Sequence, residues 1–134
     1  AGYDFSSAID IIIPSIWSIK EKNSDKSLSV LVPTGIKTYM PDNEYLMLVN
    51  RSSNPLKKNI AIPNGIGIID SDYYDNANNE GEIFVQLINY GLKDYEIKKG
   101  ERIAQGIFTR YYKADSEEEK LGKRLGGFGS TGDS

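Results

Sequence analysis

Two acids and two aromatic residues stand together at the end of the stretch from Asn64 to Tyr74, NGIGIIDSDYY. The short apolar run before them indicates a buried strand, and a carboxylate at the end of such a strand can be held in a fixed position. Asp70 and Asp72 are therefore candidates for acid–base chemistry. The alternative is a strand followed by a solvated acidic turn, and this stretch alone leaves both interpretations open.

The amino-acid composition limits which groups could perform such chemistry. The 134 residues contain no cysteine and no histidine. This excludes disulfides, thiolate and imidazole metal sites, cysteine nucleophiles and histidine-based triads. A general base would have to be Asp or Glu, and a metal ion would have to prefer oxygen ligands, as Mg²⁺ does.

Charge and hydropathy argue against two classes of partner. The net charge of −3 disfavours a nucleic-acid-binding surface, so any phosphate site would have to be local. No apolar run approaches the length of a membrane span and no signal peptide is visible, so we expect a cytoplasmic protein without a membrane partner. The sequence begins at Ala1 without a methionine, and we expect residues to precede it.

Most of the chain predicts short strands separated by turns. Strong turn signals include Pro33-Thr34-Gly35 and Pro63-Asn64-Gly65. The many short strands and few helices predict an all-β jelly-roll or barrel-like domain, with the strand at 45–49 buried on both faces. The predicted strands cover residues 9–13, 28–32, 36–40, 45–49, 60–62, 67–70, 82–88, 95–97 and 101–108.

Polar residues in two places could bind phosphate. Arg51, Ser52 and Ser53 precede Pro55, which fits the first turn of a short helix, and helix N-termini and guanidinium groups both favour anions. The alternative is a capped helix start with a surface arginine. Gln105 stands among apolar residues of a predicted strand and needs a hydrogen-bond partner, either in the backbone or in a ligand.

The chain ends in a glycine-rich segment, RLGGFGSTG, at 124–132. Four glycines between 126 and 132 indicate a flexible tail, and such termini are commonly disordered. This one also carries an arginine, a phenylalanine and two hydroxyl groups, so it could close over a ligand that contains phosphate and a ring. We therefore divide the chain into a β domain at 1–121 and a flexible C-terminal arm at 122–134.

Five motifs now stand in one order: AGYDFSS at 1, RSS at 51, NGIGIIDSDYY at 64, GERIAQ at 100 and RLGGFGSTG at 124. Over nearly the whole chain they resemble the five motifs of the trimeric dUTP pyrophosphatases (dUTPases). The polar insert after Tyr74 is similar to that of a branch found in some Gram-positive bacteria and their phages. The resemblance implies a distorted β jelly roll, and a homotrimer whose active sites are shared between subunits. It also implies Mg²⁺-dependent hydrolysis of dUTP to dUMP and pyrophosphate, which keeps uracil out of DNA and supplies dUMP.

The resemblance also implies a role for each motif. Asp70 would activate the water that attacks the α-phosphorus, and Tyr73 would pack on the deoxyribose and leave no room for a 2′-hydroxyl. A hairpin at 64–70 would pair with uracil through its backbone and reject cytosine, whose donor and acceptor pattern is reversed. Asp4 would help to hold Mg²⁺ through water. The implied base and sugar contacts are Asn64, Gly67, Ile68, Ile69, Tyr73 and Phe128, and the implied phosphate contacts are Arg51, Ser52, Ser53, Gln105, Arg124, Ser130 and Thr131.

The sequence also leaves alternatives. Many members of the family have an arginine five residues before the tail phenylalanine, where this chain has Lys123, with Arg124 one residue nearer. A dCTP deaminase-like enzyme on the same fold, or a jelly-roll binding or regulatory module, would share parts of the pattern. A regulatory protein partner of the kind proposed for phage members could contact the insert at 75–81. Asp72 and Tyr74 are expected to be structural.

Overall fold

The computed structural model describes residues 1–18 and 27–115, and these form an all-β fold. The sheet that carries Asp4, Gln105 and the residues 67–69 of the predicted site has the strand order β1-β9-β4-β6. Two further sheets have the orders β3-β7-β5 and β2-β8. The strands are β1 (Tyr3–Ser6), β2 (Ile11–Ile13), β3 (Val30–Pro33), β4 (Glu44–Val49), β5 (Ile60–Ala61), β6 (Ile66–Ile69), β7 (Phe84–Asn89), β8 (Tyr95–Ile97) and β9 (Arg102–Arg110). Two short helical segments, η1 (Asn54–Lys58) and η2 (Ser71–Tyr73), connect them.

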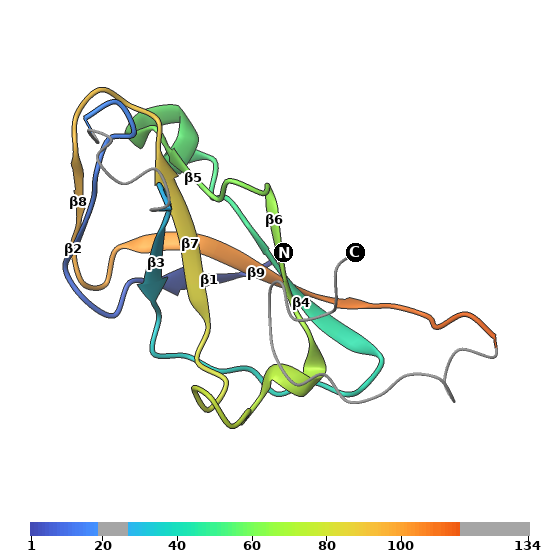
Figure 1. Cartoon of the computed structure of the whole chain (residues 1–134). Helices are drawn as coiled ribbons and strands as arrows, with labels where there is room; N and C mark the ends of the chain where they lie inside the picture. Colours follow the sequence, from blue (N-terminus) through green and yellow to red (C-terminus); the bar gives the residue numbers. More distant parts are fainter. Residues whose placement is uncertain (19–26, 116–134) are drawn as a thin grey trace.

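Strand β9 organises the four-stranded sheet, because it pairs antiparallel with β1 on one side and β4 on the other. In Figure 1 it runs across the molecule, and β7 crosses it beside β3. Gly106 allows this packing at the centre of β9. A Cβ atom there would lie 2.6 Å from the Phe5 ring and 2.9 Å from Leu46, so any larger residue would displace two core side chains.

One core gathers buried side chains from all three sheets. Its fully buried members include Ile13 of β2, Leu46 of β4, Leu87 of β7 and Ile103 of β9. Each such side chain contributes about 1.5–3 kcal/mol relative to exposure, so burial of this core holds the sheets in place around the site. Within the described residues, no helix is long and apolar enough to cross a membrane.

The strand prediction differs from the structure in three details. Strand β1 at Tyr3–Ser6 was not predicted. Residues 36–40 form no strand. The chain turns at Gly35, which has φ +69°, and the backbone then contacts the segment before β7 through a hydrogen bond in which Ile83 N–H donates to Ile36 O at 2.8 Å. Strand β4 is buried on one face rather than both. Leu46 and Leu48 are buried, whereas Tyr45, Met47 and Val49 are only half-buried. The predicted arm at 122–134 lies outside the described residues.

Candidate functional site

Three predicted site residues from three different motifs come together on the four-stranded sheet. Asp4 of β1 lies opposite Gln105 of β9, which in turn lies opposite Val49 at the end of β4. Arg51 follows Val49 by two residues, and its Nε donates to Oδ1 of Asp4 at 3.2 Å. Long-range strand pairing therefore joins residues that are far apart in the sequence into one polar group, which we call the Asp4–Arg51–Gln105 group.

Further contacts fix the segment that carries Arg51. The Gln105 side chain donates from Nε2 to the backbone carbonyl of Asn50 at 3.3 Å. This glutamine in an apolar strand therefore has a hydrogen-bond partner in the backbone. Asn54 is fully buried and donates from Nδ2 to Ile103 O at 2.9 Å. Both contacts attach this segment to β9 and limit where the Arg51 guanidinium can lie.

The predicted helix start after Ser53 is confirmed, with Pro55 in its first turn. The segment η1 has only five residues, however, and the Ser53 side chain makes no capping hydrogen bond. A helix this short has little macrodipole. An anion here would be bound by the Arg51 guanidinium and by the hydroxyl groups of exposed Ser52 and half-buried Ser53.

The stretch from Asn64 to Ile69 is a turn followed by an edge strand, so the predicted two-stranded hairpin is wrong. Gly65 has φ +80° and its N–H donates to Ile62 O at 3.0 Å. β5 before the turn pairs with β7, whereas β6 after it pairs with β4. Because β6 is the edge of its sheet within the described residues, one row of its backbone N–H and C=O groups is open to an added partner.

Asp70 and Tyr73 lie directly after β6. Asp70 is half-buried and has extended backbone, and its carbonyl accepts from Tyr73 N–H at 3.1 Å. Tyr73 is also half-buried, and its hydroxyl donates to Glu82 O at 3.0 Å and accepts from Asn79 Nδ2 at 2.7 Å. The short helical segment η2 thus turns the chain so that the acid and the aromatic ring stay at one end of β6.

These two groups of predicted site residues are well separated within one chain. Ile66 occupies the same row across the sheet as Val49, Gln105 and Asp4. Asp70 is four residues further along β6, which is roughly 13 Å at the usual rise per residue, and β6 is three strand spacings from β1, which is roughly 14 Å. Asp70 is therefore too far from the Asp4–Arg51–Gln105 group for both to contact one phosphate.

The carboxylates suit a metal ion only in one arrangement. Among the described residues, no three Asp or Glu side chains gather into a cage. Asp4 is a single carboxylate, about half exposed, with Arg51 on one oxygen and Arg102 Nη1 3.6 Å from the other. Mg²⁺ commonly keeps several waters and is bound by one or two carboxylates together with substrate phosphates. Asp4 fits that outer role.

Comparison with known proteins decides the family. The dUTPase family model matches residues 1–132. The chain belongs to the dUTPase family. It is 48% identical over 103 residues to the deoxyuridine 5′-triphosphate nucleotidohydrolase of Lactococcus lactis, covering 76% of this chain and 69% of that protein. The crystal structure of the dUTPase from Streptococcus mutans matches with a TM-score of 0.76 and 42% identity, over 86% of this chain and 81% of that one. The dUTPase from phage phi11 of S. aureus, 18% identical with a TM-score of 0.67 over 97% of this chain and 85% of that one, shares the fold.

The structure adds residues near the dUTPase motifs that the sequence did not single out. Asn79 and Glu82 hold the Tyr73 hydroxyl, and the asparagine-rich insert was the only sequence signal for them. Tyr74, expected to be structural, packs edge-on against Tyr39 with the ring centroids 5.6 Å apart. The arm residues Lys123, Arg124, Phe128, Ser130 and Thr131 lie outside the described residues.

Glu101 of the GERIAQ motif makes a second polar cluster. It accepts from Lys58 Nζ at 2.8 Å and from the Tyr95 hydroxyl at 2.6 Å, and its other oxygen accepts from Lys98 N–H at 3.1 Å. Burial alone raises the pKa of Glu101, but these hydrogen bonds outweigh it and leave that pKa below its ordinary value. The cluster connects η1, β8 and the turn before β9.

Proposed function

We propose that this chain hydrolyses dUTP to dUMP and pyrophosphate, with Asp70 as the general base. The observation that supports this most directly is the position of Asp70, half-buried at the end of an edge strand and beside Tyr73. With no histidine or cysteine in the sequence, a carboxylate is the available base. Membership of the dUTPase family gives the substrate class.

The open edge of β6 supports uracil recognition by the backbone. An extended strand offers alternating N–H and C=O groups, and the edge of uracil can pair with them as a neighbouring strand would. Asn64, Gly67, Ile68 and Ile69 are the residues of this recognition segment. Cytosine would leave backbone groups unpaired, which is a strong source of discrimination. Gly67 pairs with Leu48 of β4, so β6 is held to the sheet on its other side.

In the proposed reaction, Asp70 accepts a proton from a water molecule as the water oxygen attacks the α-phosphorus. The bond from that phosphorus to the bridging oxygen breaks, and its electron pair leaves with pyrophosphate. Tyr73 packs on the deoxyribose and thereby orients the α-phosphate next to Asp70. Arg51, Ser52, Ser53 and Gln105 bind the departing phosphates and stabilise the charge that develops on them.

We further propose a homotrimer with shared sites. The separation between Asp70 and the Asp4–Arg51–Gln105 group supports this, because a single chain does not bring both to one triphosphate. A second copy would supply the phosphate contacts to the uracil-binding strand of the first. Arg124, Phe128, Ser130 and Thr131 of the arm are proposed to complete the site over the phosphates and the uracil ring.

Magnesium is the proposed cofactor. Asp4 would hold it through water on the bound triphosphate, where the ion neutralises phosphate charge. Asp4 itself would do this while paired with Arg51, so one carboxylate serves both to orient the guanidinium and to receive the hydrated ion.

Pyrophosphate release from dUTP, compared with dCTP, dTTP and UTP with and without Mg²⁺, tests the activity. We expect dUTP to be preferred, and Asp70→Asn to lower kcat by about 10³-fold while nucleotide binding persists. Asp72→Asn is the matched control, because Asp72 is an exposed acid two residues away. Near-normal turnover in Asp70→Asn would remove Asp70 from its role, and ammonia release from dCTP would favour a deaminase instead.

A further inference from the structure

We propose that the insert after Tyr74 is a positioning device, and that Asn79 orients the Tyr73 ring for discrimination between deoxyribose and ribose. The inference rests on the proposed function of Tyr73 as the sugar-facing residue. It assigns a role to the segment 75–82, which the proposed chemistry does not otherwise use. The segment follows η2 and leads to β7, and Glu82 at its far end accepts from the Tyr73 hydroxyl, so both of its ends lie next to Tyr73.

The Tyr73 hydroxyl is held on both sides. A phenol has one hydrogen to donate and lone pairs to accept with, and here Glu82 O takes the hydrogen at 3.0 Å while Asn79 Nδ2 donates to the oxygen at 2.7 Å. The near end of the side chain is fixed by the backbone, and the far end by these two bonds. The plane and direction of the ring are therefore set by the insert.

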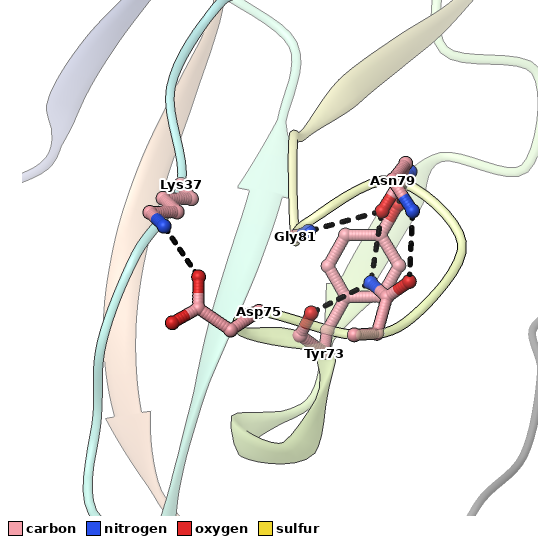
Figure 2. Close-up of polar contacts among 6 residues, drawn as sticks. Lys37, Tyr73, Asp75, Asn79 and Gly81 are labelled. Atoms are coloured by element: carbon pink, nitrogen blue, oxygen red, sulfur yellow. Dashed lines mark hydrogen bonds and ion pairs between the residues drawn. The ribbon is translucent and has the colours of Figure 1, made fainter.

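Asn79 is in turn fixed within the insert. Its Oδ1 accepts from Gly81 N–H at 3.0 Å and from Asn76 Nδ2 at 2.8 Å. Because a backbone N–H can only donate, the Gly81 contact identifies which side of the amide is oxygen, and the Nδ2 group is thereby directed at Tyr73. Asn76 Nδ2 also donates to Tyr73 O at 2.7 Å, so the network contacts Tyr73 at both its backbone and its hydroxyl. Figure 2 shows the Asn79 side chain beside the Tyr73 ring, with its amide bonded to Gly81 N–H and to the Tyr73 hydroxyl.

The base of the loop is closed tightly. Asp75 N–H donates to Glu80 O at 3.1 Å, and Gly81 has φ +90°. A Cβ atom at Gly81 would lie 2.7 Å from Asp75 N and 2.9 Å from Tyr73 O, so only glycine allows this approach. An ion pair from Lys37 to Asp75 attaches the loop to the segment before β4 (Figure 2). These contacts fix the shape of the loop, and the loop can therefore hold the Tyr73 side chain in one position.

The distribution of polar groups distinguishes this role from that of a contact surface. Asn76 and Asn79 are half-buried and their side chains bond within the loop and to Tyr73. Ala77, Asn78 and Glu80 are exposed. Asn76 and Asn79 are therefore the two residues of the insert whose side chains contact Tyr73. Replacing either of them is expected to change the position of Tyr73.

The test measures the ratio of kcat/KM for dUTP to that for UTP in four variants. Asn79→Ala and Tyr73→Phe each remove the bond between Asn79 and the hydroxyl, and each is expected to lower the ratio roughly tenfold. Asn79→Ala also removes the bonds of Asn79 Oδ1, and Tyr73→Phe also removes the bond to Glu82 O, but both changes break the bond between Asn79 and the hydroxyl. The double variant is therefore expected to lower the ratio by clearly less than the product of the two single effects. Asn78→Ala is the control, since within the described residues Asn78 contributes only its backbone N–H to the network, and it should leave the ratio unchanged.

Thermal unfolding of each variant separates positioning from folding. A lower Tm for Asn79→Ala with an unchanged dUTP:UTP ratio would overturn the proposal, as would additive effects in the double variant.

Tyr73→Ala tests the premise that Tyr73 faces the sugar, because this variant should lose the discrimination between dUTP and UTP. If that variant still discriminates, the sugar-facing role of Tyr73 fails and the proposal with it. If Tyr73→Ala loses discrimination and Asn79→Ala keeps it, the proposed function stands and only the role of Asn79 is wrong. A wild-type protein that leaves dUTP intact would overturn the proposed function itself.

Discussion

Asp4 is the residue on which two proposed roles meet, because it pairs with Arg51 and would also receive the hydrated metal. We predict that Asp4→Asn raises the KM for dUTP several-fold and increases the Mg²⁺ concentration needed for half-maximal rate. The neutral amide no longer holds the guanidinium by charge. The pair is substantially exposed, so the change in Tm should stay within about 2 °C.

Steady-state kinetics across a Mg²⁺ titration, with thermal unfolding in parallel, check this prediction. Asp42→Asn is the matched control, because Asp42 is an exposed acid on the turn before β4 and should affect neither KM nor Tm. An Asp4→Asn protein with a markedly lower Tm and an unaltered KM would show that the Asp4–Arg51 pair only supports the fold.

For individual residues, the sequence predicted which side chains belong to the candidate site but not which of them contact one another. Asp4, Arg51 and Gln105 were each singled out from local motifs. Their contact depends on the register of β1, β9 and β4, which pairs Gln105 with Asp4 and with Val49 across long stretches of sequence and leaves no local signal. The hydrogen bond from Asn79 to Tyr73 could not be predicted from the sequence either. An asparagine-rich segment has the same composition whether its amides point inward or outward.

Among the elements, η1 carries the phosphate-binding segment, and the Glu101 cluster fastens its far end through Lys58. We predict that Glu101→Gln lowers the free energy of unfolding at pH 7 by about 1–3 kcal/mol, because it removes a charged acceptor from two partly buried donors, Lys58 and Tyr95. The pKa of Glu101 is lowered in the folded protein, so its stabilising contribution is present above the ordinary value of 4.5 and is lost as the pH falls through the folded value.

Urea unfolding at pH 7 and at pH 3 measures this difference. The gap between wild type and Glu101→Gln should be clear at pH 7 and narrower at pH 3, because the stabilising contribution of Glu101 is lost as the pH falls below 4.5 and through the lowered folded pKa. Glu96→Gln is the control, since Glu96 belongs to an exposed pair with Lys98 and should change stability little at either pH. A gap that is equal at both pH values would mean that packing, and not the charge of Glu101, supports the cluster.

Most strands followed from the sequence because apolar alternation is a local property. The segment at 95–97 was predicted with its observed bounds, and the strand at 101–108 was predicted to within two residues. Residues 36–40 have the same β-favouring composition, but the chain turns at Gly35, and the hydrogen bond from Ile83 N–H to Ile36 O that follows does not extend into a strand ladder within the described residues. Within the described residues β6 is an edge strand, on which the proposed uracil recognition depends, and this follows from the strand order and has no sequence signature.

For the whole molecule, the separation of Asp70 from Arg51 within one chain has a direct consequence for mixed assemblies. If each site takes Asp70 from one subunit and Arg51 from another, then two inactive variants complement each other. Asp70→Asn and Arg51→Ala homotrimers should both be nearly inactive. Random co-assembly in equal amounts should restore activity at about a quarter of the sites, because each of the two required groups is intact with a probability of one half. A site confined to one chain would gain nothing, since every chain in the mixture lacks one of the two groups.

The measurement is dUTP hydrolysis after the two variants are unfolded together in denaturant and refolded, with the oligomer isolated by size. The control is a mixture of the two folded homotrimers without denaturant. This mixture should stay inactive until subunits exchange between the trimers. Arg51→Ala also removes the ion pair with Asp4, so Arg51→Lys serves as a second partner that keeps the charge but loses the guanidinium geometry. The shared site would be contradicted if the mixed oligomers were inactive both with Arg51→Ala and with Arg51→Lys as the second variant. The proposed reaction would then require Asp70 and its phosphate contacts within one chain, against the roughly 13 Å along β6 that separates Asp70 from the row of Gln105.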